Sequence, residues 1–323
     1  MIISIIIFVV SLIVLLKGAD WLIDGASDIA GSFNVSPILI GLSVVAFGTS
    51  LPEFIVSMFS AMAGNADFSF ANVIGSNIAN LGLGIGIAAI MAPLAVTMRT
   101  LSYEIPLFTT SMFILVFLSI DKFFRNLPTY TLGRIDGFIL ALIFFVFCGY
   151  LYKTAKEEPK SSTVEFKDYK NKKFEPKDVF YVILGIVFLA VGGNFLVSSA
   201  TDIALAIGIP SAIVAVTMVA LGTSLPELST TWIAVKKGYT QMAIGNIVGT
   251  NIFNILFVLG SVSLISPMTI MESLIFTDAA FLLVMTVLFT WFASNNQKIT
   301  PGEGIAMLSV YVIYLAQTIM SVI

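Results

Sequence analysis

The chain contains 323 residues, of which 58% are hydrophobic and only 11% are charged. Soluble domains carry charge on about a quarter of their residues, so this composition excludes a soluble globular protein and indicates an integral membrane protein. The net charge of −3 says little about partners, and no basic patch indicates nucleic-acid binding. The lack of histidine and the single cysteine, Cys148, exclude a disulfide framework and imidazole or thiolate metal sites.

The apolar runs are long and mostly unalternating, which favours helices over the strands of an outer-membrane barrel. They predict an all-α polytopic protein with ten spans, at 2–28, 36–62, 71–97, 101–120, 133–152, 178–205, 211–235, 242–264, 270–293 and 302–322. The first span is longer than the core of a signal peptide and no small-residue cleavage pattern follows it, so we interpret it as retained.

One polar segment, 153–177, interrupts the apolar pattern. It is rich in lysine and low in apolar residues, which predicts a solvated loop between spans. We therefore expect a first five-helix repeat at 1–152, a linker loop at 153–177 and a second five-helix repeat at 178–323.

The two parts of the chain match at a fixed offset of 174 residues. "GTSLPE" at 48–53 returns at 222–227, and "GSNIAN" at 75–80 returns as "GTNIFN" at 249–254. We call 44–80 and 218–254 the first and second signature segments. Because each repeat has an odd number of spans, the second must enter the membrane in the opposite sense. Such inverted repeats are typical of secondary transporters.

The distribution of positive charge predicts an orientation. With both termini outside, the cytoplasmic loops hold twelve lysines and arginines, eight of them in 153–177, whereas the outer loops hold three. Cytoplasmic loops of membrane proteins are enriched in these residues. We therefore expect a multi-pass protein of the plasma membrane, with extracellular termini and a cytoplasmic 153–177 loop.

Each signature segment places a proline and a glutamate at membrane depth. Pro52 and Pro226 should break or kink their helices, which leaves carbonyls near Ala46 and Ala220 without helical partners. Irregular backbone at this depth is tolerated only where it is buried in protein or lines a wet cavity. The sequence thus predicts a polar site at these breaks.

Glutamates within a membrane span usually mark an ion path, because an isolated carboxylate there costs at least ~2.5 kcal/mol. Glu53 and Glu227 would repel one another unless a cation lies between them. Carboxylate, hydroxyl, amide and carbonyl oxygens suit Ca²⁺ and Na⁺. The signature segments supply such oxygens at Thr49, Ser50, Ser76, Asn80, Thr223, Ser224, Thr250 and Asn254. Asp20 and Asp24 lie towards a helix end, where we expect snorkelling or capping.

These paired motifs resemble the cation/calcium antiporter superfamily, specifically its sodium/calcium exchanger branch, and the short loop resembles the compact prokaryotic members. The resemblance implies ten transmembrane helices in two inverted five-helix repeats, with broken helices at a midplane ion site. It implies that Glu53 and Glu227 are the main Ca²⁺ ligands, shared with Na⁺, and that Thr49 and Thr223 add oxygens. It further implies that flanking Na⁺ sites are lined by the carbonyls of Ala46 and Ala220 and by the hydroxyls of Ser50, Ser76, Ser224 and Thr250. Asn80 and Asn254 would complete the central site.

The expected function is exchange of Na⁺ for Ca²⁺ by alternating access. Two carboxylates carry a charge of −2, so three Na⁺ would leave a net positive charge and make exchange electrogenic. We expect a monomer that works in the lipid bilayer without a resident cofactor and is not an enzyme. The nearest alternative is H⁺/Ca²⁺ antiport on the same fold. A K⁺-dependent exchanger is disfavoured by the neutral Asn254, and a cation channel by the internal repeat.

Overall fold

A computed structural model describes residues 1–120, 129–157, 173–295 and 297–321, without the side chains at 212, 215, 216 and 218–220. Up to the linker the elements are α1 Ile2–Phe33, α2 Pro37–Ile40, π-helix η1 Gly41–Val45, α3 Ala46–Met62, α4 Ala66–Ala79, π-helix η2 Asn80–Ile85, α5 Gly86–Met91, β1 Leu94–Ala95, α6 Met98–Ser102, α7 Glu104–Ser119, β2 Tyr130–Leu132 and α9 Arg134–Glu157.

After the linker the elements are α10 Pro176–Ala206, α11 Ser211–Gly222, α12 Leu225–Lys236, α13 Thr240–Phe253, π-helix η4 Asn254–Leu259, α14 Gly260–Ile265, β3 Met268–Ile270, π-helix η5 Leu274–Ala279, α15 Ala280–Ser294, β4 Lys298–Ile299 and α16 Pro301–Met320. Sequence signals set several helix starts. Pro176 and Pro301 occupy first-turn positions, and Thr300 forms a capping box with Glu303.

The described residues contain nine helices that are long and apolar enough to cross a membrane. They overlap nine of the ten predicted spans, which confirms a mostly helical multi-pass membrane protein. The remaining predicted span, 211–235, consists of two helices of 12 residues each, α11 and α12. Each of these is shorter than the roughly 20 residues that a span needs, so the tenth span stays a prediction.

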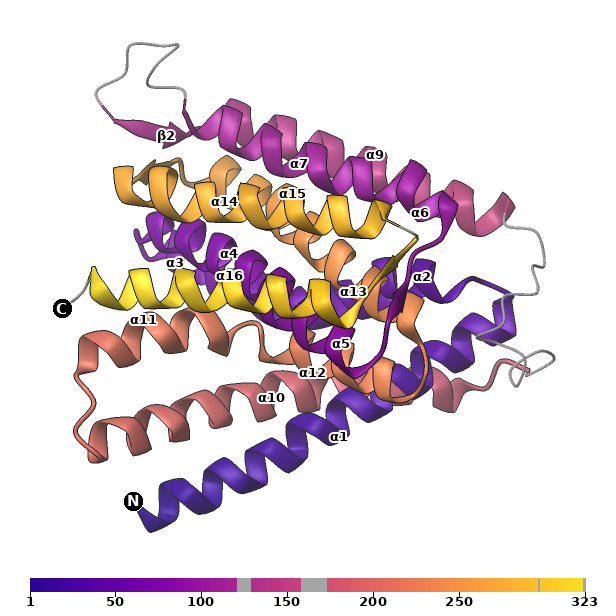
Figure 1. The fold of residues 1–323 in the computed structure, drawn as a ribbon, viewed down its shortest axis with the longest axis horizontal. Coiled ribbons are helices and arrows are strands. Elements are labelled where there is room, and N and C mark those ends of the chain that lie inside the picture. The colour runs from indigo at the N-terminus through magenta and orange to yellow at the C-terminus, as the bar shows by residue number, and fades with distance from the viewer. Residues whose placement is uncertain (121–128, 158–172, 296, 322–323) are drawn as a thin grey trace.

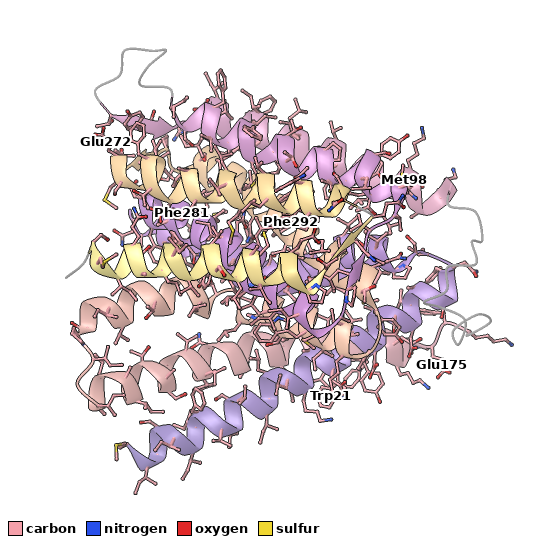
Figure 2. All side chains as sticks on the ribbon, in the orientation of Figure 1. Trp21, Met98, Glu175, Glu272, Phe281 and Phe292 are labelled. Carbon is pink, nitrogen blue, oxygen red and sulfur yellow. The ribbon has the colours of Figure 1, made fainter. Side chains whose placement is uncertain are left out.

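The helices form a bundle with α1 and α10 along one edge and α7 and α9 along the other, while α3, α4, α12 and α13 lie between these edges (Figure 1). The start of α1, the end of α16 and the 207–210 connection lie at one end, which we call the terminal end. Figure 2 shows Glu272 at the terminal end and Met98 at the opposite end. The bundle therefore has two distinct ends and a central layer.

Helices α1 and α10 pack backbone to backbone through glycine. A methyl group added at Gly18 would lie 2.8 Å from the amide nitrogen of Leu189, and one at Gly185 would lie 2.7 Å from that of Leu22. Small residues allow this close approach between membrane helices. Because the contact runs along most of both helices, α1 and α10 form one mechanical unit, which we call the α1–α10 pair.

The two parts of the chain adopt matching elements at the 174-residue offset. Helix α4 corresponds to α13, η2 to η4 and α5 to α14, each with identical lengths and shifted bounds. Two antiparallel sheets join the parts crosswise, because β1 pairs with β4 and β2 pairs with β3. Each part therefore supplies one strand to each of two short sheets that it shares with the other part.

Candidate cation site

The signature segments converge in the central layer of the bundle. Their polar side chains come from α3, α4–η2, α12 and α13–η4, and from the two residues that separate α11 from α12. Thr223 is half-buried and Ala46 is almost wholly buried. The remaining predicted site residues have 0% exposure: Thr49, Ser50, Glu53, Ser76, Asn80, Ser224, Glu227, Thr250 and Asn254. Ala220 lies in α11, and its contacts fall outside the described part of the structure.

The two glutamates lack the partners that a buried carboxylate needs. Within the described residues, neither carboxylate oxygen of Glu53 has a hydrogen-bond partner, and Oε2 of Glu227 has none either. Oε1 of Glu227 accepts a hydrogen bond of 3.4 Å from the hydroxyl of Ser50. The two carboxyl groups are close enough to interact electrostatically. Buried charges require a counter-charge, so this arrangement suits a cation between the carboxylates.

Hydroxyl groups cross between the two signature segments at equivalent positions. Oγ of Ser76 lies 2.9 Å from Oγ1 of Thr223, and Oγ1 of Thr49 lies 3.5 Å from Oγ1 of Thr250. The second pair is the first pair shifted by 174 residues and reversed. Each proline-containing segment therefore contacts the polar helix of the other part of the chain.

Four asparagines cross between α4–η2 and α13–η4 in the same reciprocal way. Asn80 donates through Nδ2 to Oδ1 of Asn251 at 3.1 Å, and Asn254 donates to Oδ1 of Asn77 at 3.3 Å. These bonds use the amide nitrogens of Asn80 and Asn254. Their Oδ1 atoms are buried and have no protein partner among the described residues. Two amide oxygens therefore remain available to a cation, while Asn77 and Asn251 position them.

The backbone differs between the two segments. Helix α3 continues through Pro52, and the carbonyl of Ala46 accepts a 3.2 Å hydrogen bond from the hydroxyl of Thr49. In the second segment α11 ends at Gly222, and Pro226 stands in the first turn of α12. Proline is compatible with a first turn because the amide there needs no helical partner. The predicted break or kink at Pro52 stays a prediction.

Two further asparagines hold the site, and the sequence arguments gave them no role. Asn246 donates to the carbonyl of Glu227 and to the hydroxyls of Thr230 and Thr231, at 2.9–3.2 Å. Its equivalent, Asn72, accepts a 3.1 Å hydrogen bond from the hydroxyl of Thr223. The sequence could have pointed to both residues, because Asn72 and Asn246 are identical and lie 174 residues apart, at the offset of the repeat.

A cavity of about 550 Å³ leads from the terminal end to the second signature segment. It lies between α10, α11 and α3, and is lined by Leu205 and Ser211 near the 207–210 connection and by Thr223 and Pro226 at its inner end. Asn194, Ser198 and Thr201 of α10 add polar groups to its wall. The cavity thus connects one end of the bundle with a site residue.

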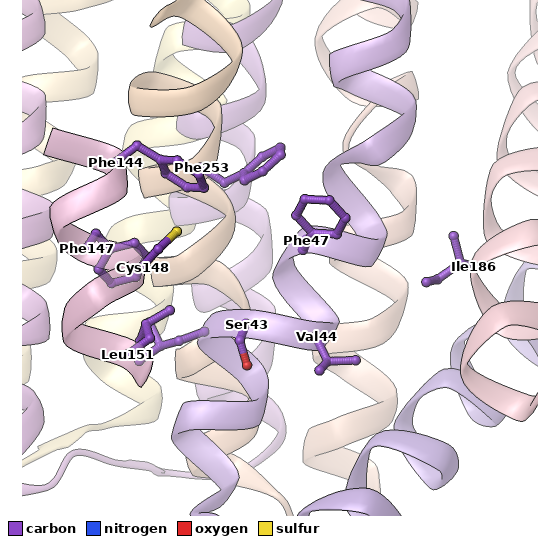
Figure 3. A pocket seen from close by; sticks show the side chains of 10 residues that line it. Ser43, Val44, Phe47, Phe144, Phe147, Cys148, Leu151, Ile186 and Phe253 are labelled. Carbon is purple, nitrogen blue, oxygen red and sulfur yellow. The ribbon is translucent and has the colours of Figure 1, made fainter. Parts of the chain in front are cut away.

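A second cavity, of about 380 Å³, is almost entirely apolar. Phe47, Phe144, Phe147 and Cys148 line it beside α3 and α9 (Figure 3). The hydroxyl of Ser43 donates to the carbonyl of Leu39 at 2.6 Å and so is already satisfied. This cavity therefore offers no ligands to an ion. No group of three or more histidine, cysteine, aspartate or glutamate side chains suited to a metal occurs among the described residues.

Comparison with known proteins gives a consistent family assignment. A family model described as "Sodium/calcium exchanger protein" matches residues 3–153 and 177–320. The sodium/calcium exchanger MaX1 of Methanosarcina acetivorans is 30% identical, over 97% of both chains. A protein described as "Putative antiporter CaxA" from Alkalimonas amylolytica is 33% identical, over 97% of this chain and 98% of its own. A structure of the sodium-calcium exchanger NCX_Mj, soaked with 10 mM Na⁺ and 10 mM Sr²⁺, superposes with a TM-score of 0.82 at 31% identity and 98% coverage of both chains.

Proposed function

We propose that this chain, which belongs to the sodium/calcium exchanger family, exchanges Na⁺ for Ca²⁺ by alternating access at the site between its signature segments. The family assignment confirms the resemblance seen in the sequence and makes the protein a membrane antiporter rather than an enzyme. The observation that carries the proposal is the set of buried oxygens on Glu53, Glu227, Asn80 and Asn254 that have no hydrogen-bond partner among the described residues.

We assign the central ligands to these four residues, with Ca²⁺ held between the two carboxylates. Ca²⁺ takes six to eight oxygens at roughly 2.3–2.6 Å, so neighbouring hydroxyl and carbonyl oxygens must contribute. The hydroxyls that cross between the segments are suited to this and to flanking Na⁺ sites. The proposed additional ligands are Thr49, Ser50, Ser76, Thr223, Ser224 and Thr250, with the carbonyls of Ala46 and Ala220.

The charge of the site links the exchange ratio to a voltage dependence that can be measured. One Ca²⁺ neutralises the two carboxylates, and so do two Na⁺, whereas a third Na⁺ would load one extra positive charge. We propose three Na⁺ per Ca²⁺ and hence electrogenic exchange, in which one charge crossing 100 mV is worth about 2.3 kcal/mol. Ca²⁺ uptake into Na⁺-loaded proteoliposomes should then change with an imposed K⁺/valinomycin potential. Uptake that is insensitive to voltage would refute the three-sodium ratio.

We further propose ten spans in two inverted repeats, 1–152 and 178–323, with the 153–177 loop in the cytoplasm and the terminal end outside the cell. In this arrangement α11 and α12 together form the tenth span. The 550 Å³ cavity then serves as the extracellular path to the site. Ion release to the cytoplasm would require the α1–α10 pair to slide against the central layer. We expect a monomer in the plasma membrane to suffice.

The test is ⁴⁵Ca²⁺ uptake into proteoliposomes loaded with Na⁺, choline or acid, for the native chain and Glu53→Gln. We expect uptake that needs internal Na⁺ and disappears in the variant. Uptake driven by a proton gradient without Na⁺ would instead establish H⁺/Ca²⁺ antiport through the same glutamates. Flux that needs no counter-ion would indicate a channel. Glu53→Gln removes a charge without changing the shape of the side chain. The purified yield and the Tm of the variant show whether it still folds.

A further inference from the structure

A cluster of charges at the opposite end of the bundle joins the α1–α10 pair to the central layer. Nζ of Lys237, which follows α12, lies 2.6 Å from Oδ1 of Asp20 and 2.7 Å from Oδ1 of Asp24, both on α1. It also donates to the backbone carbonyl of Asp20 at 3.2 Å. Lys17 lies 3.6 Å from the other oxygen of Asp20. The snorkelling or capping that we expected of these aspartates does not account for this contact between helices.

The lysine is held more firmly than an ordinary surface ion pair. Lys237 makes three contacts with one face of α1, and it is partly covered, with 24% of its side chain exposed. Helix α12 also packs directly on α1. Fixing a single lysine by several partners reduces the entropy cost that makes isolated surface pairs weak. The cluster can therefore oppose separation of α1 from α12.

The repeat provides an internal control for this cluster, because its equivalent positions carry no charge. Shifting by 174 residues replaces Asp20 and Asp24 by Asn194 and Ser198, and replaces Lys237 by Ala63. Asn194 and Ser198 line the 550 Å³ cavity at the terminal end. Thus Asp20 and Asp24 of α1 are in contact with Lys237, whereas the equivalent uncharged residues of α10 line an open cavity.

We propose that Lys237, Asp20 and Asp24 form an ionic latch that holds the opposite end of the α1–α10 pair against α12. The latch favours the conformation in which the site is reached from the terminal end. It must open before the pair can slide, so it acts on the exchange cycle without binding the transported ions. This inference rests on the proposed alternating-access function. Because the latch occurs at one end of the bundle only, it favours one conformation over the other, which the repeated signature segments do not do.

Two equivalent positions report on the two ends of the bundle. Ser27 of α1 is fully buried, whereas its equivalent, Thr201 of α10, lines the open cavity. Single cysteines at Ser27 or Thr201, each in a Cys148→Ser background, can be labelled with a membrane-impermeant maleimide in vesicles of either orientation. The labelling rate measures how often each end is open. The native latch predicts fast labelling at 201 and slow labelling at 27.

The decisive variant is Lys237→Met, which keeps an unbranched chain of similar length but removes the charge. We expect labelling at 27 to rise and labelling at 201 to fall, so that the ratio of the two rates changes by about two- to fivefold, the shift that matches a partly exposed ion pair. Asp20→Asn with Asp24→Asn should give the same shift. Combining all three substitutions should add little more, because they remove one interaction. Unchanged rates, or rates that rise at both positions, would overturn the latch.

Lys236→Met is the matched control, because Lys236 is exposed and forms no ion pair among the described residues. It should leave both labelling rates unchanged. Tm and elution volume of each variant separate loss of the latch from loss of the fold. Failure of the latch and failure of the proposed function are also distinguishable. Without Na⁺/Ca²⁺ exchange the native chain shows no Na⁺-dependent ⁴⁵Ca²⁺ uptake, whereas a wrong latch leaves uptake intact and labelling insensitive to Lys237→Met.

Discussion

The two signature segments share a motif, but they lie in different surroundings. The first follows the tightly packed start of η1, where a methyl group added at Gly41 would lie 2.5 Å from the carbonyl oxygen of Met242 in α13. Both Pro52 and Pro226 line the 550 Å³ cavity, but only in the second segment does the helix stop, at the two residues that separate α11 from α12. Equivalent sequences thus adopt different local structures because their packing differs.

This difference explains how a symmetric sequence can form an asymmetric structure. In our proposal the tight packing closes one path to the site, and the cavity opens the other. A transporter that alternates would exchange these roles between the segments during its cycle. The oxygens of the site itself remain nearly symmetric, since the hydroxyl and asparagine contacts occur in reciprocal pairs. The comparison therefore separates a symmetric binding centre from an asymmetric frame around it.

The largest expected effect tests the symmetric centre. Glu53→Gln and Glu227→Gln each leave one buried carboxylate for a divalent cation. Removing one partner of a buried charge pair costs about 3–5 kcal/mol, so each variant should lower Ca²⁺ uptake by roughly a hundredfold or more. The measurement is ⁴⁵Ca²⁺ uptake in Na⁺-loaded proteoliposomes at matched protein density. Robust uptake by either variant would show that the two glutamates do not form one shared centre.

The sequence alone predicts much of this centre, because its residues repeat and few other polar groups occupy the spans. Glu53 and Glu227 stand out by the cost of a carboxylate in lipid, and Ser76 and Asn80 by their spacing on one helix face. Family membership and the helical membrane fold are confirmed as expected.

Other features depend on packing that no local pattern encodes. The π-helices η2 and η4 begin at Asn80 and Asn254, where the asparagines cross between the two parts of the chain. The contact of Lys237 with α1 joins residues more than 210 positions apart. Neither can be read from the periodicity of apolar residues. The asymmetry of the two segments also requires knowledge of what lies beside each one.

Gly245, which has no glycine at the equivalent position of the first repeat, tests the packing around the binding centre. At Gly245 of α13 an added methyl group would lie 3.1 Å from the amide nitrogen of Leu42 and would meet the carbonyl of Ile38 more closely still. Its equivalent in α4 is already an alanine, Ala71. We expect Gly245→Ala to destabilise the protein by about 1–3 kcal/mol through overpacking against rigid backbone. A fall in Tm in detergent measures this effect.

The reverse substitution in the other segment, Ala71→Gly, is the matched comparison. It removes only a half-buried methyl group from a helix, so the expected cost is about 1 kcal/mol. If Gly245→Ala left Tm unchanged while Ala71→Gly lowered it, the tight contact between α13 and the first segment would be disproved.

The smallest expected effect is the difference in stability between variants of the two asparagines that hold the proline-containing segments. Asn246→Ala removes three hydrogen bonds from its Nδ2 atom and leaves the carbonyl of Glu227 without this donor, which should cost about 1–3 kcal/mol. Asn72→Ala removes one acceptor for Thr223, whose hydroxyl still contacts Ser76. It also removes an amide nitrogen that is buried without a partner among the described residues, which offsets part of the loss.

We therefore expect Tm to fall further for Asn246→Ala than for Asn72→Ala. The reason is that Asn246 donates to the backbone carbonyl of Glu227, whereas Asn72 accepts a hydrogen bond from the side chain of Thr223, which lines the open cavity. Asn246→Asp keeps the shape but replaces the donor nitrogen with an oxygen, so it should destabilise at least as much as alanine. Equal losses at positions 72 and 246 would mean that both segments are held alike, and that the asymmetry of the frame arises outside these contacts.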